Sequence, residues 1–212
     1  MRDHGCSVIA IARDPIALEE LKMSCAGNVG HLTTLALDIA LPGAAEEVKS
    51  LVAGRRVQAL VHNAGILLSK PIGQYVREDL YALFAANVFA PLELSQALLD
   101  ELEGDPLGHI VHVGSMGGYQ DSVKFAGLVA YSSSKAALAC MAQCMAEELK
   151  DRRIRSNCLA LGSVDTEMLR AAFPDHRSSI TSASMGAYVA RFALDGHNLF
   201  NGKVLPVAST TP

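Results

Sequence analysis

Short apolar runs, separated by segments of helical composition, constrain the fold of this chain more than any other feature. The runs lie at residues 8–12, 32–37, 57–61, 109–113, 154–160 and 203–207. Apolar runs of this length are typical of strands that are buried on both faces. Their alternation with helices predicts an α/β protein with a doubly wound parallel sheet. No linker or internal repeat interrupts residues 1–212, so we expect a single domain.

The segments between the runs carry helix signals. Asp14 and Pro15 suit the first turn of a helix that ends near Gly27. Residues 132–149 are rich in Ala, Leu, Met and Glu and contain no Gly or Pro, so they predict another helix. Further helices are predicted at residues 42–51, from 77 past 102, and at 188–194. Pro91 lies inside the longest of them and predicts a kink.

Polar residues and glycines follow the strands at the points where the strands end. They are Arg13, Asp38, Asn63-Ala64-Gly65, Gly114 with Ser115, and residues 162–166. Ligands of doubly wound parallel sheets bind beyond the carboxyl ends of the strands. We therefore expect the functional site at this edge of the sheet.

Tyr131 and Lys135 lie four residues apart at the start of the predicted helix that runs to residue 149. Side chains at this spacing lie on one helix face. A phenol titrates near pH ~10, and a neighbouring ammonium group lowers that pKa. Such a tyrosine can exchange a proton with an alcohol or carbonyl oxygen. A packed tyrosine ring beside a solvated lysine would explain the same pair without catalysis.

Composition excludes several classes of function. The formal net charge is −4 and there is no basic run, which argues against nucleic acid or an anionic membrane as a partner. No apolar run approaches the length of a membrane span, and residues 1–5 show no signal-peptide hydrophobic segment. The cysteines lack zinc-ligand spacing, so we predict no metal site and reduced, mostly buried thiols in a cytoplasmic protein.

Taken together, these residues give the chain a resemblance to the short-chain dehydrogenase/reductase family, from Val8 almost to Val207. The matching elements, in the family's order, are Ala12-Arg13, Leu37-Asp38-Ile39, Asn63-Ala64-Gly65, Asn87, Ser115, Tyr131 with Lys135, and Gly162 to Thr166. The resemblance implies a Rossmann-like fold and an oxidoreductase that interconverts a carbonyl and an alcohol by hydride transfer. It also implies a homodimer or homotetramer.

The resemblance implies a role for each catalytic candidate. Tyr131 is the acid/base, and Lys135 lowers its pKa and binds the nicotinamide ribose. Ser115 holds the substrate oxygen. Asn87 holds a water molecule of the proton relay.

The resemblance also implies the cofactor contacts. Asp38 and Ile39 correspond to adenine contacts, Asn63-Ala64-Gly65 approaches the adenosine ribose, and Val164 and Thr166 would contact the carboxamide and a phosphate. Where a carboxylate would select NAD, this chain has Ala12, followed by Arg13. A guanidinium suits a 2′-phosphate, so we predict NADP, with NAD and a merely solvated Arg13 as the alternatives.

One part of the family pattern has no counterpart in this sequence. The family's first strand, its glycine-rich turn and its first helix are missing before Val8, and residues 1–5 are interpreted as the tail of that helix. In the 3-2-1-4-5-6 strand order, the missing strand lies between residues 8–12 and 57–61. The sequence is incomplete, or it is a short form that cannot hold the cofactor pyrophosphate, or another chain or segment fills the gap.

Two other functions stay open. A redox-inactive binding or scaffold protein could retain the wound sheet without the pyrophosphate loop. A nucleotide-sugar epimerase or dehydratase shares the tyrosine and lysine pair, although the short segment at residues 170–184 and Asn63-Ala64-Gly65 argue against it. The sequence identifies neither the substrate nor the physiological direction of the reaction.

Overall fold

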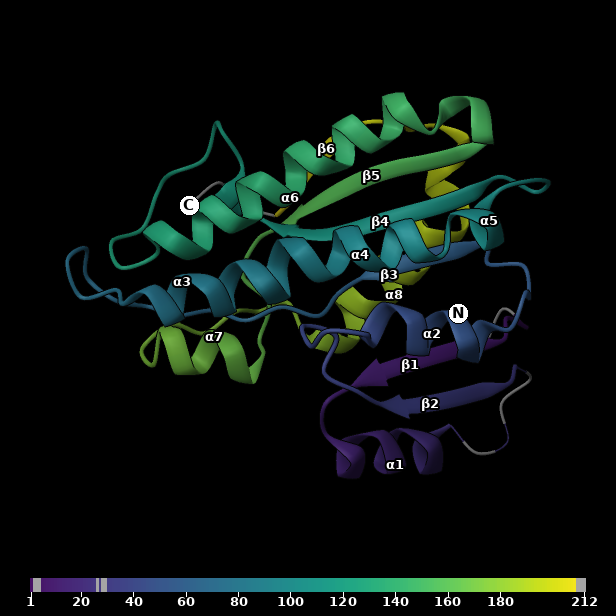
Figure 1. Ribbon diagram of the computed structural model, residues 1–212. Helices are drawn as coiled ribbons and strands as arrows, with labels where there is room; N and C mark the ends of the chain where they lie inside the picture. The colour runs from purple at the N-terminus through teal and green to yellow at the C-terminus, as the bar shows by residue number, and fades with distance from the viewer. Residues whose placement is uncertain (2–4, 26, 28–29, 209–212) are drawn as a thin grey trace.

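The strands of the protein form two parallel sheets (Figure 1). The structure is a computed structural model that describes residues 1, 5–25, 27 and 30–208. In one sheet β1 (Val8–Ala12) pairs with β2 (Leu32–Ala36). The other contains, in spatial order, β3 (Ala59–His62), β4 (Gly108–Ser115), β5 (Ile154–Leu161) and β6 (Val204–Val207). Each strand falls on a predicted run and each pairing is parallel, so the predicted α/β class is confirmed.

The two sheets are separated at the position of the strand missing from the sequence. Within the described residues, no strand lies between β1 and β3. Met1 and Gly5 are not helical, and residues 2–4, which complete the proposed helix tail, lie outside the described residues. The end of the chain at residues 209–212 lies outside them as well.

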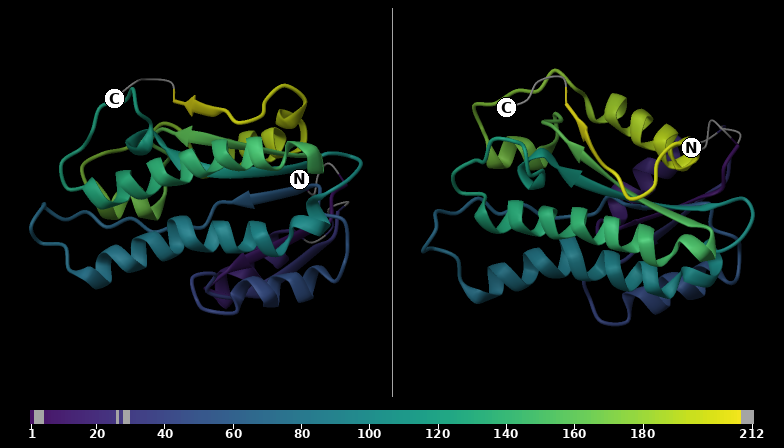
Figure 2. Two further views of the ribbon diagram at one scale, coloured as in Figure 1. Left: turned by 45° about the horizontal axis from the view of Figure 1, so that its top comes forward. Right: turned by 90° about the horizontal axis from the view of Figure 1, so that it is seen from above.

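Helices cover both faces of the sheets (Figure 2). They are α1 (Pro15–Ser24), α2 (Ala44–Val52), α3 (Arg77–Phe84), α4 (Ala90–Ala97), α5 (Leu99–Leu102), α6 (Val129–Glu148), α7 (Glu167–Ala172) and α8 (Ser182–Asp195). α6 packs on β4 and β5, whereas α8 packs on β3 and β4 from the opposite side. In this part of the chain, no helix combines the length and the apolar character needed to cross a membrane.

The predicted single helix from residue 77 past 102 is wrong in detail. It is divided into α3, a π-helical turn at Ala85–Phe89, α4 and α5. Pro91 lies in the first turn of α4, which continues directly from the π-helical turn. Proline has no backbone N–H, so it cannot donate a hydrogen bond to the carbonyl four residues earlier. The wider π-helical turn accommodates that missing hydrogen bond.

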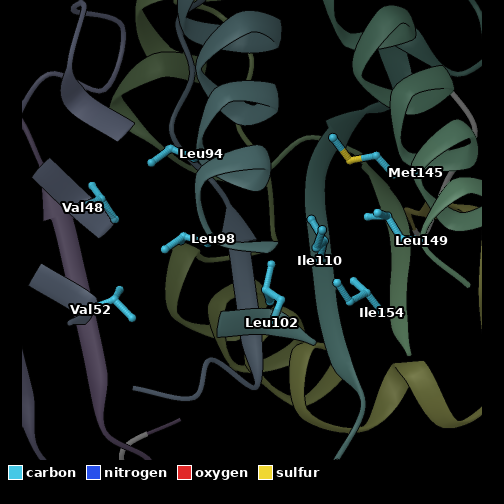
Figure 3. Packing of buried hydrophobic residues seen from close by; sticks show 9 residues of the cluster. All are labelled: Val48, Val52, Leu94, Leu98, Leu102, Ile110, Met145, Leu149 and Ile154. Atoms are coloured by element: carbon cyan, nitrogen blue, oxygen red, sulfur yellow. The ribbon is translucent and has the colours of Figure 1, made fainter. Parts of the chain in front are cut away.

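The main hydrophobic core joins α2 to the larger sheet (Figure 3). Val48 and Val52 of α2 point toward Leu94 and Leu98. The cluster is completed on the other side by Leu102, Ile110, Met145, Leu149 and Ile154. Met145 of α6 is therefore a core residue.

The cysteines follow the sequence prediction only in part, and His62 is a packed residue. All five cysteines are free of disulfides, but only Cys158 is buried, so the prediction of mostly buried thiols is wrong. His62 is buried at the end of β3 and shares a 2.8 Å hydrogen bond with Ser95, as expected of a packed residue. Among the described residues, no cluster of three His, Cys, Asp or Glu side chains could hold a metal ion.

Candidate active site

Tyr131 and Lys135 lie one turn apart on α6, and both are buried, at 9% and 5% exposure. Lys135 Nζ donates to the carbonyl of Val113 at 3.0 Å, which ties the helix to β4. At Gly118, just after β4, an added Cβ would lie 2.7 Å from the backbone of Lys135. Only glycine permits this approach, and the approach seals Lys135 beneath the loop.

Burial lowers the pKa of the Lys135 ammonium to about 8. The group lies close to Gly65 and Asn87, because a Cβ built on Gly65 would be 3.2 Å from Lys135 Nζ and 2.9 Å from Asn87 Oδ1. Gly65 therefore allows the loop after β3 to close over both side chains. Lysine and asparagine come together here from elements that are distant in sequence.

The pKa of the Tyr131 phenol is raised from its ordinary value, because burial disfavours the phenolate. A hydrogen bond with the Ser115 hydroxyl acts in the opposite direction and is the smaller effect. The expectation that the neighbouring ammonium sets a lowered pKa is therefore wrong in this structure. Ser115 Oγ also accepts the amide N–H of Gly117 at 3.1 Å.

Asn87 is fully buried on the π-helical turn, and both ends of its amide are used. Its Oδ1 accepts from the Ile66 amide at 2.9 Å, and its Nδ2 donates to the Ile66 carbonyl at 3.0 Å. Nδ2 also donates to Ser134 Oγ at 2.9 Å, and Ser134 Oγ donates to the carbonyl of Tyr131 at 2.7 Å. Asn87 thus clamps the loop after β3 to α6. Sequence reasoning missed Ser134, although its position one residue before Lys135 was visible.

Six predicted cofactor residues line one cavity of about 1020 Å³ between β1 and β3. They are Arg13, Asp38, Ile39, Asn63, Ala64 and Gly65. Arg13 and Asp38, which follow β1 and β2, form an exposed ion pair at 3.9 Å. The carboxylate of Asp38 also accepts the amide N–H of Ala40 at 3.0 Å. The structure brings together polar groups from the ends of three strands, as predicted.

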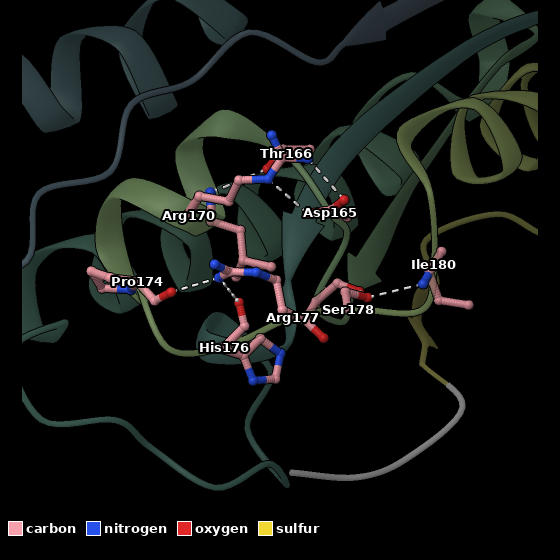
Figure 4. A network of polar contacts seen from close by, with 10 residues as sticks. Asp165, Thr166, Arg170, Pro174, His176, Arg177, Ser178 and Ile180 are labelled. Atoms are coloured by element: carbon pink, nitrogen blue, oxygen red, sulfur yellow. Dashed lines mark hydrogen bonds and ion pairs between the residues drawn. The ribbon is translucent and has the colours of Figure 1, made fainter.

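Val164 and Thr166 follow β5 in the chain and are not among the residues that line this cavity. Figure 4 shows the polar contacts around Thr166. Thr166 Oγ1 caps α7 by accepting the amide N–H of Leu169 at 3.2 Å. Between them, Asp165 binds Arg170 through two hydrogen bonds of 2.9 and 2.8 Å. The backbone of Asp165 also bridges to Thr181. The predicted residues therefore form two groups, with the Tyr131 and Lys135 pair outside the lining of the cavity.

The polar side chains that line the cavity fit a dinucleotide in part. Arg13 offers a guanidinium for a phosphate and Asp38 a carboxylate for a hydroxyl group. Gly65 lets the chain pass close to Asn87 and Lys135. These are features of an α/β protein that binds a ligand at the carboxyl ends of its parallel strands.

The chain belongs to the short chain dehydrogenase family, because a model of that family matches residues 1–177. It is 35% identical over 186 residues to protein FixR of Bradyrhizobium diazoefficiens. That match covers 84% of this chain and 64% of FixR. It is 36% identical over 115 residues to a 2,3-dihydro-2,3-dihydroxybenzoate dehydrogenase of Escherichia coli, covering 54% of this chain and 45% of that protein. The chain thus spans about half to two thirds of these relatives.

Solved structures share the fold. A variant of a Serratia marcescens short-chain dehydrogenase/reductase is 25% identical, with a TM-score of 0.84 over 97% of this chain and 87% of that one. A candidate NAD(P)-dependent gluconate 5-dehydrogenase from Beutenbergia cavernae, solved with bound NADP at low occupancy, is 25% identical. Its TM-score is 0.79, and the match covers 94% of this chain and 84% of that chain.

Proposed function

We propose that this protein is an NADP-dependent oxidoreductase that interconverts a carbonyl and an alcohol, with Tyr131 as the acid/base. The observation that carries the proposal is the buried pair of Tyr131 and Lys135 on one helix, with Ser115 bonded to the phenol. Membership of the short chain dehydrogenase family supports the reaction class. When bound, the nicotinamide supplies or accepts the hydride.

The side chains handle the proton. The raised pKa keeps the Tyr131 phenol protonated at neutral pH, in the form that can donate to a carbonyl oxygen during reduction. The hydroxyl of Ser115 holds the same oxygen. The ammonium of Lys135, with a pKa of about 8, is mostly charged at pH 7 and would bind the nicotinamide ribose. Asn87 orders the proton relay behind Lys135.

Arg13 supports the choice of NADP. It lines the cavity beside Asp38, and its side chain is 68% exposed, so a phosphate can reach it. The Beutenbergia cavernae relative was solved with bound NADP. Asp38, Ile39 and the segment 63–65 would hold the adenosine part, and Val164 with Thr166 the nicotinamide end. A homodimer or homotetramer and a cytoplasmic location stay predictions.

The test is turnover of a panel of carbonyl compounds, followed by NADPH consumption. Tyr131→Phe should fold and lose roughly 10²- to 10⁴-fold in turnover, because only the proton donor is removed. Tyr188→Phe on α8 is the matched control and should leave turnover unchanged. Near-normal turnover by Tyr131→Phe would reject the proposal.

A redox-inactive binding protein is the second candidate, and the open cavity between β1 and β3 favours it. The two candidates differ in cofactor binding. Addition of this chain to NADPH changes the nicotinamide fluorescence if the first is right and leaves it unchanged if the second is right.

A further inference from the structure

Three segments surround the buried apolar cluster that contains Tyr131. The cluster consists of Leu83, Leu128, Ala130 and Tyr131. Residues 66–68, in the loop after β3, pack against it, and so does Phe173 at the end of α7. The third segment, residues 116–128, follows β4 and leads through Leu128 into α6. These contacts place the Tyr131 ring in apolar surroundings.

Hydrogen bonds tie the loops after β3 and β4 to each other. The carbonyl of Gly127 accepts the Lys70 amide at 2.9 Å and the Tyr75 hydroxyl at 2.7 Å. Gly127 has a φ of +82°, and a Cβ built on it would lie 2.9 Å from Ser69 Oγ, so this approach requires glycine. Two walls of the site are therefore fixed relative to each other.

The third wall, α7, is attached to them by apolar contacts. Within the described residues, the hydrogen bonds of residues 166–178 stay inside the segment 163–181. Phe173 meets Phe125 of the loop after β4 edge to face, with the ring centroids 6.1 Å apart. One such pair favours the closed arrangement only about fivefold, so a ligand that offers both rings a new partner can separate them.

The basic side chains of these three segments already have partners. They are Lys70 with Asp79, Lys124 with the Tyr119 carbonyl, Arg170 with Asp165, and Arg177 with the carbonyls of Pro174 and His176 (Figure 4). In this described part of the chain, no lysine or arginine is left to pair with an anionic substrate. A charged group next to apolar walls without a partner is unfavourable, so an uncharged ligand fits this site.

We propose that the substrate is an uncharged carbonyl compound with an aromatic ring within a few bonds of its carbonyl group, and that the ring binds between Phe125 and Phe173. The side chain of Phe125 is 38% exposed and offers free ring surface. A ring in this position keeps an aromatic partner for each phenylalanine and buries apolar surface. This inference rests on the proposed function, because it identifies the substrate class of the same site.

The test compares benzylacetone with butan-2-one, which lacks only the phenyl group, and follows NADPH consumption. kcat/KM should be about 100-fold higher for benzylacetone, because its ring is buried. Phe125→Ala should lower this preference about tenfold, since one ring partner is lost. Tyr188→Ala is the matched control and should keep the preference. Tyr188 is also 38% exposed, and its ring pairs with that of Phe192 at 6.5 Å.

Binding is measured separately, from the fluorine NMR signal of para-fluorobenzylacetone titrated with the whole chain, with and without NADPH. Phe125→Ala should weaken this binding about tenfold, whereas Tyr188→Ala should leave it unchanged. The para-carboxylate of benzylacetone, used as a competitor, should bind at least about tenfold more weakly than benzylacetone, because its charge finds no partner.

The outcomes separate this inference from the proposed function. Turnover of both ketones without a preference, or equal changes in Phe125→Ala and Tyr188→Ala, would overturn the inference and leave the activity standing. Equal binding of the carboxylate would also overturn it. Binding that depends on Phe125, without turnover of either ketone, would confirm the ring site and reject the proposed activity. Absence of both binding and turnover would reject both.

Discussion

At the scale of single residues, burial sets the protonation of the two side chains on α6, raising the pKa of Tyr131 and lowering that of Lys135. The four-residue spacing placed Tyr131 and Lys135 on one face of a helix, and the structure buries both. The direction of the Tyr131 pKa shift depends on burial, which comes from packing against Leu83 of α3 and against Ile66 in the loop after β3. No local pattern around Tyr131 contains that information.

Lys135 makes stability depend on pH. Its pKa of about 8 in the folded chain lies below the ordinary 10.5, so the unfolded chain binds more protons between these values. Burial of the charge therefore lowers stability fully below pH ~8, and stability recovers by about 3 kcal/mol as the pH rises to ~10.5. Lys135→Met should abolish this rise.

Urea unfolding of both proteins between pH ~7 and ~10 measures the difference. Comparing the two removes the contribution of Tyr131, whose raised pKa acts in the alkaline range of both proteins. The charge of Lys135 itself lowers the pKa of the Cys158 thiol, so Cys158→Ala is introduced into both proteins before the comparison. Parallel pH profiles would show that Lys135 titrates normally.

Arg13 should decide between NADPH and NADH. Arg13→Ala removes the guanidinium from the cavity wall and should weaken NADPH binding about tenfold while leaving NADH binding nearly unchanged, because only NADPH carries the 2′-phosphate. Fluorescence titration of both cofactors gives the ratio. Arg55→Ala, at the other end of the cavity, is the control and should keep the preference. An unchanged ratio in Arg13→Ala would mean that this arginine is only a solvated residue.

At the scale of elements, the strands lie where the sequence predicts them, whereas the helix containing Asn87 is more divided than predicted. Apolar runs mark buried strands directly, and β1 begins and ends where its run does. The π-helical turn at Ala85–Phe89 was not predicted, because composition does not distinguish it from α-helix. The turn positions Asn87 between the Ile66 backbone and Ser134.

Two substitutions remove different hydrogen bonds of the Asn87 side chain. Asn87→Ala removes three hydrogen bonds and leaves the Ile66 amide and carbonyl unpaired, so it should lower the free energy of unfolding by about 3 kcal/mol. Ser134→Ala leaves both bonds to Ile66 intact and should lower it by about 1 kcal/mol. Urea unfolding measures both values. Equal losses, or the reverse order, would show that the clamp does not hold the loop.

At the scale of the whole molecule, the family pattern predicted where the sheet is interrupted but not how the smaller part is held. β4 is buried except for half-buried Ser115, whereas no residue of β1 is fully buried. The smaller sheet is attached through α2, whose Val48 and Val52 pack against Leu94 and Leu98 of α4. These contacts join segments more than forty residues apart, which local sequence patterns do not reveal.

The smaller sheet with α1 and α2 should therefore open as a unit before the rest of the molecule unfolds, because few buried contacts hold it. Hydrogen exchange followed by mass spectrometry should show faster exchange in β1 and β2 than in β4 and β5. Val52→Ala removes a buried contact worth about 2 kcal/mol and should speed exchange in β1 about 30-fold without changing β4. Leu138→Ala on α6 is the control and should speed exchange in β4 and β5. If Val52→Ala accelerated all strands equally, the protein would instead unfold as one cooperative body.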